Sequence, residues 1–275
     1  MEILNDLPEE QYVEVDEFLA YIGIYDDDKR LNAYSRWLQK LDGWIRGRTV
    51  VEAGAGFGLI SRKILEHSPA KLIAVESNPL TFNVLKNRLG GDSRVVPINM
   101  PVEEFVPSGH IDLLVHEFYG SMLYDENLFA LEMLRFVPEQ VFPDGGELRA
   151  AVVSLRHIHD EVVDQTVLRQ LEGVIVGDLF VEHPLTPQDF DIPVARYRFG
   201  EGIATFDVDI SGKDGELVAF SLFITHGDDV VCSAIECQNW SIGWTPRAGD
   251  RFRVDYIVED GYSRTIFSWK NRTTG

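Results

Sequence analysis

Short apolar runs alternate with helical segments between residues 49 and 155, and this alternation limits the fold more than any other feature of the chain. The runs are rich in β-branched residues and have the length of buried strands. They are expected at TVVEAG (49–54), KLIAVES (71–77), RVVPIN (94–99), IDLLVHEF (111–118) and a closing strand around 147–155. Helices are expected at 59–67, 79–89 and around 126–136. Such alternation builds a parallel, doubly wound sheet of the α/β class.

The periodicity changes to two after about residue 155, where GIATFDVDISG, ELVAFSLFITH and DRFRVDYIVEDG have the pattern of half-buried strands joined by Gly- and Asp-containing turns. This half predicts an antiparallel sandwich or barrel. A helical pattern at 29–46 precedes the first strand. We therefore expect an N-terminal helical segment over 1–46, the doubly wound domain over 47–146 and the antiparallel domain over 147–275.

The charge balance and the cysteines restrict the class of protein. With 45 acids against 25 bases, the net charge of −20 disfavours nucleic acid as a partner and favours cationic substrates, although acidity also simply aids solubility. No run approaches the roughly 20 apolar residues of a membrane span, so we expect no membrane partner. Cys232 and Cys237 lack neighbouring histidines, which favours two reduced thiols over a zinc site. Together with an acidic N-terminus unlike a signal peptide, this predicts a cytoplasmic protein.

A glycine-rich turn follows the first expected strand in VVEAGAGFGLIS, which contains Glu52, Gly54, Gly56 and Gly58. Glycine lets the backbone turn tightly and lets a ligand approach the main chain, while the start of the next helix supplies free N–H groups. The spacing is G-x-G-x-G, rather than the G-x-G-x-x-G of dinucleotide-binding folds. The chain also lacks the lysine of a phosphate-binding loop at this point.

Two acids further along the chain suggest the ligand. Glu76 ends the second expected strand, where a carboxylate can accept hydrogen bonds from both ribose hydroxyls of a nucleoside, although a solvated strand end is the alternative. Glu103 follows the third strand, where an acid can accept from an adenine amino group, and its neighbour Glu104 is an alternative for this contact. The glycine turn, the acid for the ribose and the acid for the adenine follow three successive strands, and this combination favours an S-adenosyl-L-methionine site.

Residues 116–128 read HEFYGSMLYDENL and place Glu117 and Glu126 nine positions apart. Along a helix or a strand, that spacing turns the two carboxylates in opposite directions. They meet only if the chain folds back, with Gly120 as the natural hinge. The alternative is a solvated acid on a loop followed by a helix-capping acid. Glu117 ends the fourth expected strand, at the edge where ligands bind in such sheets.

This stretch resembles the "double-E" hairpin of the protein arginine methyltransferase family, and the resemblance extends to VVEAGAGFGLIS, IAVESNPL, PVEEF and the β-rich second half. It covers most of residues 20–270, with its sharpest motifs in 51–126. The resemblance implies a Rossmann-like methyltransferase sheet followed by an antiparallel β-barrel or sandwich. It also implies S-adenosyl-L-methionine as cofactor, no metal, and Glu117 and Glu126 as the catalytic grip on an arginine guanidinium.

The chemistry agrees with that implication. A guanidinium stays protonated and presents a planar fork of donors that suits carboxylates. The methyl donor is a sulfonium cation, so two carboxylates offset the repulsion between two positive groups. The acceptor is free arginine or arginine in a peptide or protein. Two alternatives remain: a methyltransferase for another amine or amidine, and a non-catalytic member of the family that binds the cofactor.

Three parts of the chain depart from the family pattern. Gln238-Asn239-Trp240 stands where the family has Thr-His-Trp, so Asn239 cannot carry a proton; the resemblance leaves Asn239 and Trp240 as substrate-binding candidates, with a core tryptophan as the alternative. The family arginine that pairs with the methionine carboxylate of the cofactor falls on Tyr34, with Arg30 and Arg36 as possible substitutes.

The third departure concerns association between copies of the chain. Residues 160–185 occupy the place of the family's dimerisation arm but are somewhat short. A homodimer is thus expected by analogy alone, and a hairpin of the barrel is the alternative.

Overall fold

The computed structural model describes residues 22, 27–155, 165–177, 185–237, 240–259 and 261–270. The chain divides into two compact units. Unit 1 comprises Met1–Glu117 and Leu134–Phe142, and unit 2 comprises Phe118–Met133 and Pro143–Gly275. The boundaries expected at 46/47 and 146/147 stay predictions. No helix in the described part of the chain combines the length and the apolarity that a membrane span requires.

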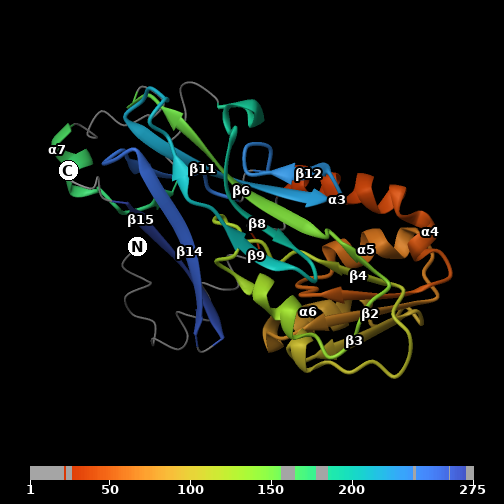
Figure 1. Ribbon diagram of the computed structural model, residues 1–275. Helices are drawn as coiled ribbons and strands as arrows, with labels where there is room; N and C mark the ends of the chain where they lie inside the picture. The colour runs from red at the N-terminus through yellow and green to blue at the C-terminus, as the bar shows by residue number, and fades with distance from the viewer. Residues whose placement is uncertain are drawn as a thin grey trace, which may run out of the picture. The chain divides into compact units, whose positions relative to one another are not determined.

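Unit 1 contains a five-stranded parallel sheet with the order β3-β2-β1-β4-β5 (Figure 1). Its strands are β1 Thr49–Ala53, β2 Lys71–Glu76, β3 Val95–Asn99, β4 Leu113–His116 and β5 Gln140–Phe142. Its helical elements are α3 Asp28–Lys40, α4 Asp42–Ile45, α5 Leu59–Glu66, α6 Pro79–Leu89 and the 3₁₀ turn η1 Val102–Glu104. Because the strand order runs outward in both directions from β1, the predicted doubly wound sheet is confirmed.

Local capping signals account for two of the helices. The side chain of Asp27 accepts a hydrogen bond from the backbone N–H of Arg30 at 2.9 Å, which starts α3. Asn78 caps α6 in the same way, with Pro79 as the first helical residue. The buried face of α3 comprises Arg30, Ala33, Tyr34 and Leu38, which recur at helical spacing.

Two expected elements near the end of the parallel pattern are wrong. The closing strand of the parallel sheet is β5, whereas the strand expected around 147–155 is β6 Gly145–Val153, which pairs with β11 over nine residues in unit 2. That long antiparallel ladder satisfies far more backbone groups than a parallel pairing of β5's length. The helix expected around 126–136 is the 3₁₀ segment η2 Asn127–Met133. Four successive residues, Leu128–Leu131, are buried there, which does not fit the single apolar stripe of an α-helix.

Unit 2 is antiparallel, as predicted. A seven-stranded sheet has the order β7-β13-β11-β6-β8-β9, with β12 paired to β11, and a three-stranded sheet has the order β10-β14-β15. The strands are β7 Val176–Gly177, β8 Ile192–Arg198, β9 Gly202–Thr205, β10 Val208–Asp209, β11 Leu217–His226, β12 Asp229–Ser233, β13 Gly243–Pro246, β14 Arg251–Glu259 and β15 Tyr262–Trp269. Nine of the ten residues of β11 are buried, so this strand is the centre of the core.

The segment expected to form a dimerisation arm is described in part. Residues Gln165–Gln170 form α7, and β7 pairs with β13 in the sheet of unit 2. The 3₁₀ turn η4 Pro187–Asp189 follows. Within the expected arm at 160–185, residues 160–164 and 178–184 lie outside the described residues, so the arm stays a prediction.

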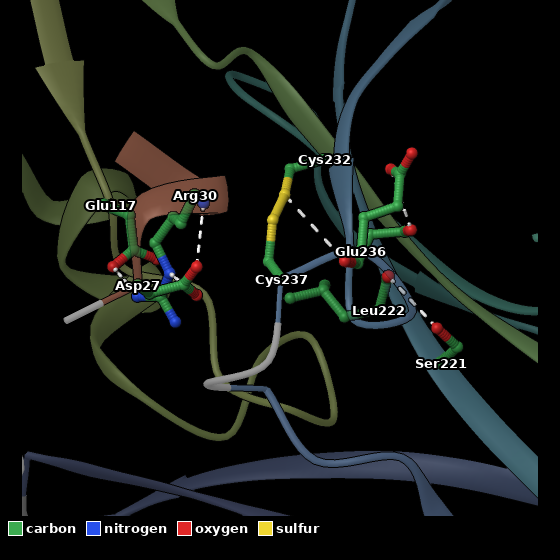
Figure 2. Close-up of a disulfide and its surroundings, with 9 residues drawn as sticks. Asp27, Arg30, Glu117, Ser221, Leu222, Cys232, Glu236 and Cys237 are labelled. Carbon is green, nitrogen blue, oxygen red and sulfur yellow. Dashed lines mark hydrogen bonds and ion pairs between the residues drawn. A yellow bond between two sulfur atoms is a disulfide. The ribbon is translucent and has the colours of Figure 1, made fainter. Parts of the chain in front are cut away.

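The expectation of reduced thiols is wrong, because Cys232 and Cys237 form a disulfide (Figure 2). Cys232 lies in β12, and a turn follows in which the N–H of Cys237 donates to the carbonyl of Ser233 at 2.9 Å. This turn brings the second sulfur back to the first, and both cysteines are buried. A C-x4-C spacing does not reveal such a turn, which depends on where β12 ends.

Candidate functional site

The predicted cofactor residues gather at the carboxyl edge of the sheet in unit 1. The glycine turn follows β1, Glu76 ends β2, Glu103 lies in η1 after β3, and Glu117 follows β4. These four strands are neighbours and parallel, so their carboxyl ends share one edge. The strand order reverses between β1 and β4, which is the position where doubly wound sheets bind ligands.

The glycine turn has a backbone that other residues adopt only with strain. The φ angles of Gly54, Gly56 and Gly58 are 66°, 52° and 78°, all in the left-handed region. A Cβ atom added to Gly58 would lie 2.7 Å from Cδ1 of Leu89, so this position also needs glycine for packing. The turn leads directly into α5, whose first N–H groups point along the helix axis toward the same edge.

Glu76 is held by the main chain on both of its carboxylate oxygens. Its Oε2 accepts from the N–H of Gly56 at 2.7 Å, and its Oε1 accepts from the N–H of Asn78 at 2.8 Å. Burial raises the pKa of Glu76, and these two hydrogen bonds act in the opposite direction. The side chain of Thr81 and the backbone of Ser77 also hydrogen-bond to this carboxylate and lower its pKa. The carboxylate is therefore fixed in place at this edge of the sheet.

Glu52 lies behind the turn, and its environment differs from that of Glu76. It is buried within β1, and the hydroxyl of Ser61 on α5 donates to its Oε2. Burial raises the pKa of Glu52 to about 8, with a smaller contribution from the charge of Glu76, whereas Ser61 lowers it. At neutral pH Glu52 is mostly protonated, and it ties β1 to α5. A direct cofactor contact by Glu52 stays a prediction, as does the adenine contact of the half-buried Glu103.

Glu117 is already bound to a guanidinium. Nη1 of Arg30 donates to its Oε2 at 2.7 Å, and Nε of Arg30 lies 3.6 Å from Oδ2 of Asp27 (Figure 2). The side chains of Arg30 and Asp27 are buried and that of Glu117 is 12% exposed, and charged groups persist in such surroundings only when they are paired. Of the two substitutes weighed for the family arginine, Arg30 is the one at this edge, whereas Arg36 is exposed.

Tyr34, where the family arginine was expected, is a core residue. Its side chain is fully buried, its hydroxyl donates to the carbonyl of His116 at 3.4 Å, and its ring packs edge-on against Phe142. Arg30 lies one helical turn earlier on the same face of α3. An arginine within the apolar stripe of an amphipathic helix was the sequence signal for its buried position.

The chain reverses at residues 120–123, as the sequence predicted, and this hairpin belongs to unit 2. Gly120 and Leu123 form an antiparallel bridge, and the N–H of Leu123 donates to the carbonyl of Gly120 at 2.9 Å. A Cβ atom on Gly120 would lie 2.1 Å from Oδ1 of Asp125, so the close approach of Asp125 requires glycine. Leu123 has a φ of 75°, which costs a non-glycine residue about 1–2 kcal/mol.

Side chains from distant parts of unit 2 hold this hairpin. The indole N–H of Trp240 donates to the carbonyl of Tyr119, and the hydroxyl of Tyr119 donates to the carbonyl of Gly145, both at 2.9 Å. The hydroxyl of Tyr256 donates to the carbonyl of Met122 at 2.7 Å. Trp240 is buried, and its hydrogen bond to Tyr119 is its contact with the hairpin. Its role as a wall of the substrate pocket stays a prediction.

Glu126 is exposed and follows Asp125 on the second arm of the hairpin. It belongs to unit 2, and Glu117 belongs to unit 1, so the pairing of the two carboxylates stays a prediction. Asn239 lies outside the described residues, and its expected substrate contact also stays a prediction.

The chain is similar in sequence to several known proteins. No family model matches the chain. It is 28% identical over 149 residues to Histone-arginine methyltransferase CARMER of Aedes aegypti, a match that covers 49% of this chain and 24% of that protein. It is 26% identical over 164 residues to Protein arginine N-methyltransferase 6 of Xenopus laevis, covering 58% of this chain and 48% of that protein. The chain thus spans about a quarter to a half of the length of these relatives.

Solved structures match over a larger share of the chain. The Trypanosoma brucei PRMT1 enzyme–prozyme heterotetrameric complex with AdoHcy has a TM-score of 0.64 at 13% identity, covering 90% of this chain and 96% of that chain. Arabidopsis thaliana protein arginine methyltransferase 10 has a TM-score of 0.63 at 13% identity, covering 89% and 96%. The chain has the fold of the protein arginine methyltransferases. The resemblance read from the sequence motifs is confirmed at the level of sequence similarity and fold.

Outside the edge where the arginine methyltransferase motifs gather, unit 1 also brings together His110, Asp112 and Glu139, whose potential ligand atoms lie within 4.8 Å of one another. They precede β4 and β5 and therefore lie at the amino edge of the sheet, opposite the glycine turn. Oδ1 of Asp112 is 2.9 Å from Nη1 of Arg48, and its Oδ2 accepts from the N–H of Thr49 at 2.8 Å. The Asp112 carboxylate is thus already engaged. A reaction without a metal stays the prediction for the carboxyl edge.

Proposed function

We propose that the chain is an S-adenosyl-L-methionine-dependent N-methyltransferase that acts on an arginine guanidinium. The observation that carries this proposal is the ion pair of Arg30 and Glu117, in which the Glu117 carboxylate binds a guanidinium. Glu117 follows β4, and β4 is the neighbour of β1, the strand that leads into the glycine turn. Support comes from relatives named as arginine methyltransferases and from a similar fold solved with AdoHcy.

The residues at the carboxyl edge fit the chemistry of the cofactor. Glu76 offers two main-chain-anchored oxygens to the ribose hydroxyls, and Glu103 offers an acceptor to the adenine amino group. Gly54, Gly56 and Gly58 expose the backbone of the turn, while Glu52 braces it from behind. Arg30 supplies a buried cation for the carboxylate of the methionine portion. When bound, the cofactor supplies an electrophilic methyl group on a sulfonium.

The acceptor side of the reaction falls to Glu117 and Glu126. Both carboxylates would accept from the planar N–H fork of the guanidinium and hold one terminal nitrogen toward the methyl carbon. In the transfer, the sulfur–methyl bond breaks, a nitrogen–methyl bond forms, and one N–H proton leaves to a carboxylate or to water. Two negative charges offset the repulsion between the two cations, so preset electrostatics and orientation supply most of the acceleration.

The substrate class rests on the same charges. A net charge of −20 attracts cationic acceptors, whether free arginine, an arginine-containing peptide or a protein. Transfer to another amine or amidine keeps the cofactor half of the site unchanged and is the second candidate. A cofactor-binding member without turnover is the third.

One experiment separates these functions. The protein is incubated with methyl-labelled cofactor and, in parallel, with free arginine, an arginine-rich peptide or a cell extract. Wild type is compared with Glu117→Gln and Glu126→Gln, and a third variant, Arg36→Ala, controls for any change on the exposed face of α3. Label on arginine that disappears in both glutamine variants and persists in the control supports the proposal. Label on another amine, or cofactor binding without any transfer, contradicts it.

Two further parts of the proposal concern the cell. A homodimer is proposed by analogy, given that the similar Trypanosoma brucei structure is a heterotetrameric complex, and sedimentation tests it. A cytoplasmic location is also proposed, and the disulfide makes it testable, because disulfides seldom persist in a reducing compartment. Because both cysteines are buried, thiols trapped by acid in intact cells are alkylated after unfolding, and Cys232 and Cys237 should then both be modified. A fully oxidised pair in freshly trapped cells contradicts the cytoplasmic location.

A further inference from the structure

The turn of the hairpin contains a carboxylate that the proposed reaction does not use. Asp125 precedes Glu126 in the chain, and its Oδ1 accepts a hydrogen bond from the N–H of Met122 at 2.9 Å. The same oxygen lies 2.1 Å from where a Cβ atom of Gly120 would be. The carboxylate therefore fills the space that glycine leaves open between the two arms of the hairpin.

The peptide groups around Met122 are held from two directions. The side chain of Asp125 accepts a hydrogen bond from the N–H of Met122. The carbonyl of Met122 accepts from the hydroxyl of Tyr256 at 2.7 Å and from the N–H of Tyr124 at 3.0 Å. Leu123, between these groups, has a φ of 75° and is fully buried. A non-glycine residue keeps such a conformation only where its surroundings determine it. The shape of the turn thus depends on the side chains that bind Met122.

The two arms also approach each other closely at Gly120 and Glu126. The Cβ position of Gly120 is 3.1 Å from Cγ of Glu126, so the first arm limits where the Glu126 side chain begins. A change in the turn moves Glu126 directly, since Asp125 is its chain neighbour. Glu126 is the exposed carboxylate that we assign to the substrate cation.

We propose that Asp125 is a positioning residue, which fixes the turn by accepting the N–H of Met122 and so sets the geometry with which Glu126 meets the substrate cation. This inference rests on the proposed function. The role needs an oxygen acceptor at this position and does not need a negative charge. Asparagine keeps an acceptor oxygen of the same reach, whereas alanine removes it.

The test compares Asp125→Asn and Asp125→Ala with Asp189→Ala. Asp189 is a matched control, because its Oδ2 accepts the N–H of Thr186, also three residues earlier, at 2.6 Å but outside the hairpin. The transfer assay gives kcat and KM for the acceptor, and calorimetry gives the affinity for the cofactor. We expect Asp125→Ala to lower kcat/KM about 100-fold, as for a catalytic group displaced by about 1 Å, with unchanged cofactor affinity. Asp125→Asn and Asp189→Ala should keep most of the wild-type value.

A second measurement does not depend on turnover. Hydrogen exchange of the Met122 amide should be slow in wild type and Asp125→Asn and fast in Asp125→Ala, with unchanged exchange in β11 as evidence of folding. Equal loss of activity in both Asp125 variants contradicts the inference, because the charge would then matter. Equally slow exchange of the Met122 amide in all proteins also contradicts it. If wild type methylates no acceptor, the proposed function fails, and the exchange experiment still decides whether Asp125 holds the turn.

Discussion

The carboxyl edge of unit 1 and the hairpin of unit 2 carry the two halves of the proposed site, and they are held in different ways. At the edge, the hydrogen bonds of Glu76 join residues 2 and 20 positions away. In the hairpin, the partners of Tyr119 and Met122 are Trp240 and Tyr256, which lie 121 and 134 positions away. Glu76 is thus held by residues near it in the chain, whereas the hairpin also depends on remote strands; the ion pair of Arg30 and Glu117, 87 positions apart, is the long-range contact at the edge. A change near Glu76 should therefore remain local, whereas a change in the antiparallel sheets of unit 2 should reach the hairpin.

The largest effect in this comparison is expected from Arg30→Ala. Breaking a buried ion pair leaves an uncompensated charge and costs about 3–5 kcal/mol. Urea unfolding measures the loss, and hydrogen exchange should show it in β1 and β4 of unit 1 while β11 of unit 2 keeps its protection. Arg36→Ala, on the exposed face of the same helix, is the control. A loss below 1 kcal/mol in Arg30→Ala would mean that this edge does not depend on the pair.

The next effect depends on pH and tests Glu52, which lies behind the glycine turn and is hydrogen-bonded to Ser61. The pKa of Glu52 in the folded protein is about 8, above its ordinary value of 4.5, so the stability linked to its protonation is complete below pH 4.5 and is lost as the pH rises toward 8. Glu52→Gln stays neutral and should lack this loss, gaining roughly 3 kcal/mol over wild type at pH 7 and nothing at pH 4. Glu66→Gln on the exposed side of α5 is the control. A pH-independent difference would contradict the assigned burial.

Gly58→Ala tests the backbone of the turn itself. The left-handed φ of 78° and the contact at 2.7 Å from Leu89 together should cost about 2–3 kcal/mol. Thermal unfolding measures the stability, and calorimetry should show weaker binding of the cofactor. Gly91→Ala, where an added Cβ meets no atom within 4 Å, should leave both unchanged. Equal behaviour of the two variants would remove the structural reason for glycine at position 58.

The smallest effect is expected in unit 2, from loss of the disulfide. Closing a loop as short as the one between Cys232 and Cys237 is worth about 2 kcal/mol. Cys232→Ser/Cys237→Ser should unfold at lower denaturant, and wild type in reductant should match it. The double variant serves as its own control, because reductant should not change it. Wild-type stability that is insensitive to reductant would show that the thiols are not joined in solution.

The fold class could be predicted because its signals are local. Periods of two and 3.6 residues, the glycine turn and acids at strand ends each occur within a few residues of one another. The assignment of the last parallel strand failed because β5 is only three residues long and β6 follows it almost at once. Its partner β11 begins more than 60 residues later. Pattern alone does not say which of two nearby apolar runs joins which sheet.

Apart from Arg30, the side chains that support the site could not be predicted for the same reason. Arg30 was weighed only as a substitute, although its position on the buried face of α3 was visible in the spacing. The contacts of Trp240 and Tyr256 with the hairpin, and the disulfide, depend on where remote strands and turns end. Sequence patterns indicate which side chains carry the chemistry, whereas the side chains that hold them in place become visible only in the folded chain.

The central claim is that Glu117 and Glu126 bind one guanidinium together, and a double-mutant cycle on kcat/KM tests it most directly. Glu117→Gln, Glu126→Gln and the double variant are compared with wild type under saturating cofactor. If both carboxylates hold the same cation, each single change should lower kcat/KM about 100-fold, and the double variant should be little worse than the weaker single variant. If the two losses instead multiply to about 10,000-fold, the carboxylates act independently, and the account of a shared grip on the substrate is contradicted.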